Sequence, residues 1–106
     1  MLAIMCGIAG LLNIDATPWD GAPPDLAAML AAMRHRGPDH CGSFVDGPLA
    51  MGVDRLIIVD PDPRSNQPFS SPDGRFTMAY NGEIYNFREL RRLLGDRNHA
   101  CRTAGD

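Results

Sequence analysis

The sequence predicts a small α+β domain, because patterns typical of strands and of helices both occur along its 106 residues. Apolar side chains within residues 26–33 recur at i, i+3, i+4 and i+7, the spacing of one helix face. Within residues 76–80 larger side chains alternate with Thr and Ala, which is typical of a half-buried strand. Apolar residues make up 44% of the chain, enough for a core, and no repeat or linker divides it. We therefore expect one domain.

The first half is expected to hold a strand, a helix and a group of short strands. The apolar run 8–14 predicts a buried strand, and the proline-rich segment 17–24 predicts a loop. The helix is expected to begin at Pro24 or Asp25 and to end at Gly37-Pro38. Strand-like runs follow at 43–45, 49–53 and 56–59.

The second half is expected to hold a long loop, one strand and a second helix. Residues 60–74 are rich in Pro, Asp and Ser, which predicts the loop. Asn81-Gly82 predicts a tight turn or a backbone position with positive φ. Asn86 followed by Glu89 has the spacing of a capping box at a helix start. We expect Gly95 to end this helix, whose core-facing side chains should be Leu90, Leu93 and Leu94.

Charge and cysteine content exclude several classes of function. A formal net charge of −3 argues against nucleic acid or an anionic membrane as a partner. The three cysteines lack C-x-x-C spacing and the histidines lack ligand spacing, so neither a disulfide framework nor a metal site is expected. The apolar start of the chain is too short for a signal peptide or a membrane span. These features together predict a cytoplasmic protein.

Cys6 is the most informative single residue, because it directly follows Met5. If the residues before it are removed, its thiol and a free α-amine belong to one residue. That pair is a complete minimal nucleophile and base. With residues 1–5 in place, the Cys6 nitrogen is an amide without a basic lone pair. Taken alone, the position favours a buried structural thiol over a nucleophile.

Five separated motifs, in order, carry a resemblance that spans essentially the whole chain. They are MCGIAG at 5–10, HRGPD at 35–39, RLIIVD at 55–60, NGEIYN at 81–86 and TAGD at 103–106. The chain resembles the glutaminase domain of glutamine-hydrolysing asparagine synthetases, a class II amidotransferase of the N-terminal-nucleophile hydrolase fold. The resemblance implies a four-layer αββα sandwich, with two antiparallel sheets between helices, that is incomplete in this chain.

The same resemblance implies a division of the chain and a function. Residues 1–5 are expected to be a leader or a start site placed too early, and residues 6–106 the N-terminal part of the domain. We interpret the chain as a fragment or truncated product that lacks the synthetase domain, where the family uses ATP and Mg to amidate aspartate. The implied function is the glutaminase portion of asparagine synthesis, with no cofactor in this part. Glutamine is the implied ligand, and self-association or docking to a synthetase domain is left open.

The resemblance also assigns site residues. Cys6 attacks the side-chain amide of glutamine, while the Asn81 side chain and the Gly82 N–H form the oxyanion hole. Arg55 clamps the α-carboxylate, and Asp106 accepts from the α-ammonium. The glutamine pocket is completed by backbone groups at Ile58, Val59 and Glu83. Without the motifs, Asn81-Gly82 is an ordinary turn signal, and an isolated Arg or Asp is a surface charge.

Two further features limit what the sequence assigns. The 35–39 motif receives no catalytic step and is expected to organise the loops beside the pocket. Val53-Asp54 departs from the more polar or basic pair that the family has before the matching arginine, Arg55. Two other functions stay open: an amidotransferase that delivers ammonia to another acceptor, and a non-catalytic module that docks through unpaired strand edges.

Overall fold

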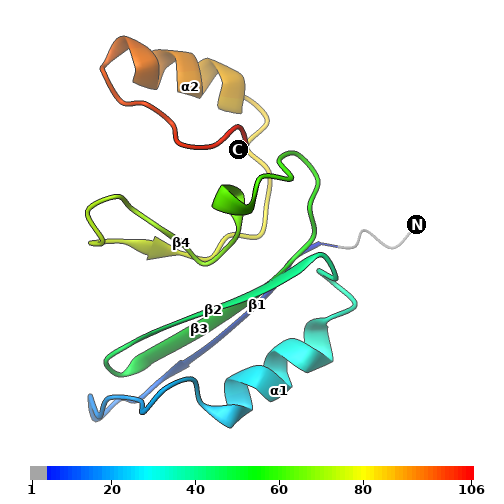
Figure 1. The fold of residues 1–106 in the computed structure, drawn as a ribbon, viewed down its shortest axis with the longest axis vertical. Helices are drawn as coiled ribbons and strands as arrows, with labels where there is room; N and C mark the ends of the chain where they lie inside the picture. The colour runs from blue at the N-terminus through cyan, green and yellow to red at the C-terminus, as the bar shows by residue number, and fades with distance from the viewer. Residues whose placement is uncertain (1–4) are drawn as a thin grey trace.

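The computed structural model describes residues 5–106, so the expectations about a leader lie almost wholly outside the described residues. It shows a mixed α/β chain with antiparallel sheets, in agreement with the predicted class. In Figure 1 helix α1 packs on one face of a three-stranded sheet, and a small second sheet and helix α2 lie on the other side. The candidate site lies where these two parts meet.

The three-stranded sheet brings the start of the chain beside the segment after its central strand. Its members are β1 (Gly7–Leu12), β2 (His40–Asp46) and β3 (Leu49–Arg55), in the order β1-β3-β2. Gly7 pairs with Asp54 in the antiparallel register, so Cys6 lies close to the end of β3. A two-residue turn joins β2 to β3, with Gly47 at φ 53°, a conformation that favours glycine.

Helix α1 (Pro24–Met33) supplies one wall of a small core. Leu26 and Leu30 are buried against Ala9 and Ala50 of the sheet. The predicted start at Pro24 is confirmed, since proline is compatible with the first helical turn. The helix ends at Met33 instead of Gly37-Pro38, and residues 34–36 form a turn that leads away from it.

The predicted strand at residues 56–59 is wrong. Irregular backbone follows β3, because Leu56 and Ile57 donate their N–H groups to the Cys6 sulfur and to the Asp39 carboxylate. The 60–74 segment contains a short 3₁₀ turn (Pro63–Ser65) and strand β4 (Phe69–Ser70). Strand β5 (Thr77–Met78) pairs with β4, so the strand predicted over 76–80 exists but is shorter, and Phe76 is exposed.

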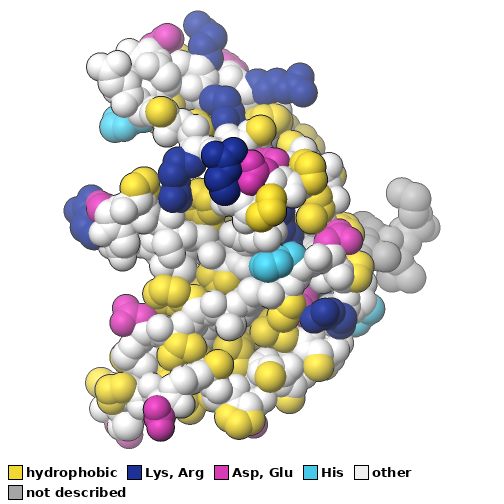
Figure 2. All heavy atoms as spheres, viewed as in Figure 1, with side chains coloured by type: hydrophobic (Ala, Val, Ile, Leu, Met, Phe, Trp, Pro, Cys, Tyr) yellow, Lys and Arg dark blue, Asp and Glu magenta, His cyan; other side chains and the backbone are white. Residues whose placement is uncertain are grey.

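Helix α2 (Phe87–Asp96) begins where the capping pattern predicts, but its packing differs. Asn86 is the N-cap residue, although its side chain makes no capping hydrogen bond. The leucines predicted to face the core are 40–45% exposed: Leu90, Leu93 and Leu94. Gly95 lies inside the helix, and Asn98 at φ 61° takes the left-handed position after it. In the view of Figure 2, several arginines gather in the upper half of the molecule, near α2 and the second sheet.

Candidate active site

One cavity of about 330 Å³ is formed between the start of β1, the segment after β3, the segment before α2 and the end of the described chain. It is lined by every predicted site residue: Cys6, Arg55, Ile58, Val59, Asn81, Gly82, Glu83 and Asp106. Residues without a predicted role also line it, among them Asp60, Gln67 and Tyr80. The volume lies at the small end of the range of ligand pockets, which suits a ligand of amino-acid size.

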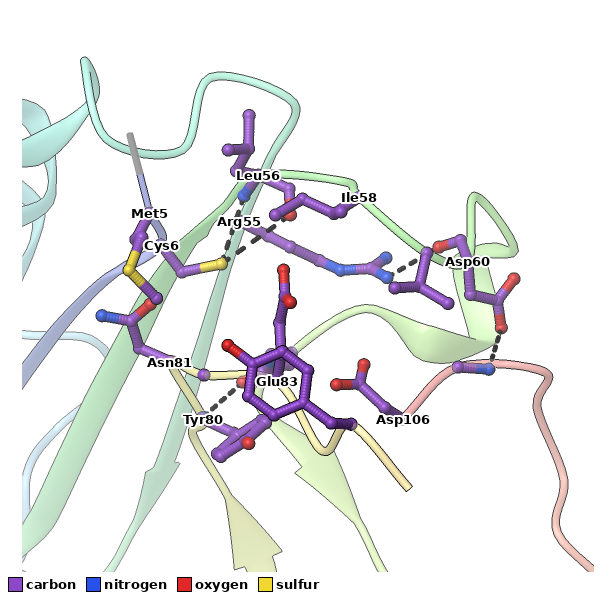
Figure 3. A pocket seen from close by; sticks show the side chains of 15 residues that line it. Met5, Cys6, Arg55, Leu56, Ile58, Asp60, Tyr80, Asn81, Glu83 and Asp106 are labelled. Carbon is purple, nitrogen blue, oxygen red and sulfur yellow. Dashed lines mark hydrogen bonds between the residues drawn. The ribbon is translucent and has the colours of Figure 1, made fainter. Parts of the chain in front are cut away.

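The Cys6 thiol is held at one side of this cavity. The Leu56 backbone N–H donates to Cys6 Sγ over 3.3 Å, and Sγ lies 3.8 Å from the Leu56 carbonyl oxygen that accepts from it. Figure 3 shows the thiol between Leu56 and the labelled Asn81. The backbone of Leu56 therefore fixes the position of the thiol in the cavity wall.

The 35–39 motif holds the backbone around the thiol, as predicted. Arg36 Nε donates to the Cys6 carbonyl oxygen over 3.3 Å. Asp39 Oδ2 accepts from the Ile57 N–H over 2.7 Å, and the Asp39 N–H donates to the Arg55 carbonyl over 3.1 Å. Gly37 is needed for this approach, because a Cβ there would lie 2.0 Å from the backbone oxygen of Asp54. The motif thus fixes loops beside the cavity.

Arg55 is buried, with 7% of its surface exposed. Hydrogen bonds at both terminal nitrogens orient its guanidinium. Nη1 donates to Asn66 Oδ1 over 2.8 Å, and Nη2 donates to the Asp60 carbonyl over 2.7 Å. A guanidinium carries five N–H donors, so donors beyond these two are available to a ligand in the cavity. A planar donor group held in this way suits a carboxylate.

Asn81 lies across from Arg55 in the wall of the same cavity (Figure 3), and Gly82 also lines this cavity. Within the part of the chain that the structure describes, neither the Asn81 amide nor the Gly82 N–H has a hydrogen-bond partner. Of the two alternatives predicted for this pair, a tight turn or a positive φ, the positive φ is not found at either residue. A Cβ at position 82 would lie 2.8 Å from the Tyr80 hydroxyl oxygen, so a side chain there would require the Tyr80 ring to shift.

Asp106 reaches the cavity through contacts that the sequence does not reveal. Its Oδ2 accepts from the Ile84 backbone N–H over 2.7 Å, which ties the 103–106 motif to the 81–86 motif. Gln67 connects the loop before β4 to the segment after β5, since its side-chain oxygen accepts from the Tyr80 N–H. No local pattern distinguishes Gln67 from other polar loop residues, because its partner lies 13 residues further along the chain.

Asp60 is the main residue that sequence reasoning missed, although it closes the 55–60 motif. It is 5% exposed, and its carboxylate accepts from the Ser65 hydroxyl and from the backbone N–H groups of Asp62, Ala104 and Gly105. The Ser65 hydrogen bond contributes most, and with the backbone donors it lowers the Asp60 pKa to about 2. A carboxylate stays ionised there at any ordinary pH.

Comparison with known families shows which family this chain belongs to. The family model described as "Glutamine amidotransferase domain" matches residues 5–106. The chain belongs to the glutamine amidotransferase domain family. This assignment makes the cavity of Cys6, Arg55 and Asp106 the natural candidate for the amidotransferase active site.

Relatives of this amidotransferase domain include glutamine-hydrolysing asparagine synthetases. The chain is 36% identical over 103 residues to asparagine synthetase [glutamine-hydrolyzing] 2 of Bacillus subtilis (strain 168), and 39% identical over 105 residues to the asparagine synthetase of Triphysaria versicolor. Each match covers 96% of this chain but only 13% and 17% of the respective relative. The domain is therefore homologous to the glutaminase portion of these enzymes, and it spans less than a fifth of their length.

Residues 5–106 of the amidotransferase domain contain neither a cluster of metal ligands nor a helix that could span a membrane. In this part of the chain, His, Cys, Asp and Glu side chains form no group of three or more that could hold a metal ion. No helix among the described residues combines the length and the apolar character needed to cross a lipid bilayer.

Proposed function

We propose that this domain hydrolyses glutamine to glutamate and ammonia, with Cys6 as the nucleophile. The observation that carries the proposal is the meeting of Cys6, the Asn81-Gly82 donors, Arg55 and Asp106 around one cavity of about 330 Å³. These groups come from four separate motifs, and each has the chemistry that one part of a glutamine molecule requires.

In the proposed reaction, Cys6 Sγ attacks the side-chain amide carbon of glutamine. The α-amine of Cys6 takes the thiol proton and returns it to the leaving nitrogen, so ammonia departs as the thioester forms. Water then cleaves the thioester to release glutamate and restore the thiol. The base role requires that Cys6 be the first residue of the mature chain, because an amide nitrogen is not basic.

The Asn81 side chain and the Gly82 N–H are the proposed oxyanion hole. Both donors line the cavity that contains the thiol, and neither has a partner among residues 5–106. They would donate to the oxygen of the tetrahedral intermediate, where negative charge develops. Loss of one such donor typically costs about 3 kcal/mol of barrier, or roughly a hundredfold in kcat.

The α-amino-acid end of glutamine is proposed to bind between Arg55 and Asp106. The Arg55 guanidinium receives the carboxylate, and Asp106 accepts from the ammonium. Glutamine extends from there toward Cys6, with backbone groups at Ile58, Val59 and Glu83 completing the pocket. Support for this orientation comes from the positions of the two charged side chains on the side of the cavity away from the thiol in Figure 3.

Within a whole protein, we propose that residues 6–106 form the N-terminal part of a four-layer αββα domain. The exposed face of β1, where Ile8 and Leu12 are 42% and 61% exposed, supports a further layer in that arrangement. The ammonia would pass to a synthetase domain that binds ATP and Mg and amidates aspartate in the cytoplasm. Docking of the two domains, or self-association, would cover apolar surface of the kind seen on α2.

The proposal is tested by glutamine turnover in three forms of the purified protein. The wild type should release equal amounts of glutamate and ammonia, and Cys6→Ala should lose this activity. Cys41→Ala is the matched control, since Cys41 is an exposed thiol on β2 that does not line the cavity. N-terminal sequencing of the active protein should read Cys-Gly-Ile. Equal, negligible rates for wild type and Cys6→Ala would overturn the proposal.

A further inference from the structure

Asp60 contacts Arg55 and the backbone directly before Asp106, the two residues that are proposed to bind the charged ends of glutamine. Its backbone carbonyl accepts from Arg55 Nη2 over 2.7 Å. Its side-chain Oδ2 accepts from the backbone N–H groups of Ala104 and Gly105 over 2.9 and 3.0 Å. Gly105 directly precedes Asp106. One residue therefore connects the two ends of the binding site.

The Asp60 carboxylate is already occupied by protein donors. Oδ2 also accepts from Ser65 Oγ over 2.5 Å, and Oδ1 accepts from the Asp62 N–H over 3.0 Å. Only 5% of the residue is exposed, although it lies in the cavity wall. Both oxygens are thus engaged, so Asp60 acts on a ligand through its neighbours and does not bind it directly.

Arg91 of α2 holds the same segment from the opposite side. Its Nη2 donates to the Gly105 carbonyl over 2.6 Å, and its Nη1 donates to the Thr103 carbonyl. Asp60 therefore accepts from the N–H groups of Ala104 and Gly105, and Arg91 donates to the carbonyl groups of Thr103 and Gly105. The Asp106 side chain that emerges from this segment is fixed by the Ile84 N–H.

We infer that Asp60 is a positioning residue that sets the distance between Arg55 and Asp106, and so tunes the cavity to ligands with a complete α-amino-acid end. The inference rests on the proposed function, because it takes Arg55 and Asp106 as the groups that bind glutamine. A ligand without the α-ammonium does not use Asp106, so it should be insensitive to a loss of this spacing.

The test compares two ligands in the Asp60→Asn variant, which keeps the size of the side chain but replaces one acceptor oxygen by a donor. Binding is measured by calorimetry in the Cys6→Ala protein, so that glutamine is not consumed. We expect L-glutamine to bind about tenfold more weakly, which equals roughly 1.4 kcal/mol. Glutaramic acid, which has the carboxylate and the amide but no ammonium, should change less than about twofold. Equal weakening of both ligands, or no change for either, would overturn the inference.

Two pairs of variants separate positioning from general damage. Asp62→Asn is the control for Asp60→Asn, because among residues 5–106 the Asp62 side chain bonds only to Arg64. Arg91→Met should reproduce the selective loss of L-glutamine, whereas Arg92→Met should not, since Arg92 is exposed and pairs with Asp96. If Arg91→Met binds L-glutamine as tightly as the protein with Arg91 intact, the proposed role of Arg91 in positioning residues 103–105 is overturned.

Hydrogen exchange provides a readout that does not depend on glutamine. In Asp60→Asn the amides of Ala104 and Gly105 should exchange at least about tenfold faster than in wild type, because they lose their acceptor. The Ile84 amide should also exchange faster, because its acceptor Asp106 is held less firmly in the variant. If the Cys6→Ala protein with Asp60 intact binds neither ligand, the proposed function is overturned. Unchanged amide exchange in Asp60→Asn would instead overturn the positioning role of Asp60.

Discussion

Arg36 Nε donates a hydrogen bond to the backbone carbonyl of Cys6, which lies 30 residues earlier in the chain. The Arg36 side chain is exposed, so this contact adds little to the core and acts mainly on the position of the proposed nucleophile. It explains why a recognisable motif with no catalytic group lies beside the site.

Replacement of Arg36 should therefore affect catalysis more than stability. We expect Arg36→Met to lower kcat/KM for glutamine about tenfold, because small displacements of a nucleophile reduce its rate strongly. The free energy of unfolding should change by less than about 0.5 kcal/mol, as for other exposed positions. Arg88→Met on α2 is the control and should leave both quantities unchanged. A large loss of stability in Arg36→Met would contradict this view.

Because Gly37 approaches β3 closely, we expect the stability of the fold to depend strongly on the absence of a side chain at position 37. A Cβ at position 37 would lie 2.0 Å from the Asp54 oxygen and 2.7 Å from the Arg55 carbonyl carbon, and backbone atoms cannot move aside cheaply. Gly37→Ala should lower the free energy of unfolding by about 3 kcal/mol. Gly95→Ala is the opposite case, since among the described residues no atom beyond the neighbouring residues and the helix backbone lies within 4 Å of the added Cβ, and alanine favours the helix. It should raise stability by about 0.5 kcal/mol in urea unfolding.

We expect the buried Asp54 to affect both the stability of the fold and the reactivity of the Cys41 thiol. The residue is fully buried, and its carboxylate oxygens have no hydrogen-bond partner among the described residues. Burial raises the pKa of the neighbouring Cys41 thiol, and the Asp54 carboxylate raises it further. Asp54→Asn should stabilise the fold by about 1 kcal/mol, because it removes a buried charge whose ion pair with the exposed Arg34 side chain spans 3.9 Å.

The same Asp54→Asn substitution should make Cys41 alkylate faster at neutral pH, since a lower thiol pKa leaves more thiolate. Peptide mass spectrometry can follow this rate, with the exposed Cys101 of the same molecule as the internal reference. A slower or unchanged rate at Cys41, with Cys101 constant, would show that Asp54 does not act on the thiol.

We expect the Asp60 carboxylate to make the stability of the fold sensitive to acid over a defined pH range. Its pKa is lowered from 3.8 to about 2 by the Ser65 hydroxyl and by backbone donors. A depressed pKa in the folded state adds stability that is present above the unfolded value and is lost as the pH falls through the folded value. Thermal unfolding should therefore show wild type losing stability between about pH 4 and pH 2 more steeply than Asp60→Asn. Parallel profiles would mean that the Asp60 hydrogen bonds contribute little to folding.

Local patterns in the sequence were enough to predict the mixed class, the start of α1 at Pro24 and the position of α2. These features depend on side-chain periodicity and capping within one segment, which neighbouring residues carry by themselves. The sequence motifs also identified Cys6, Arg55, Asn81 and Asp106 as candidates, and the structure brings them around one cavity.

Only the tertiary structure decided how these residues are held. Residues 56–59 have the apolar character of a strand, yet the N–H groups of Leu56 and Ile57 bond to Cys6 and Asp39, so no strand forms. The leucines of α2 have the period of a core face, yet they are exposed, because packing requires a partner surface as well as a pattern. Asp60 meets Ala104 and Gly105 across 44 and 45 residues of chain, and a contact of that range leaves no local trace in the sequence.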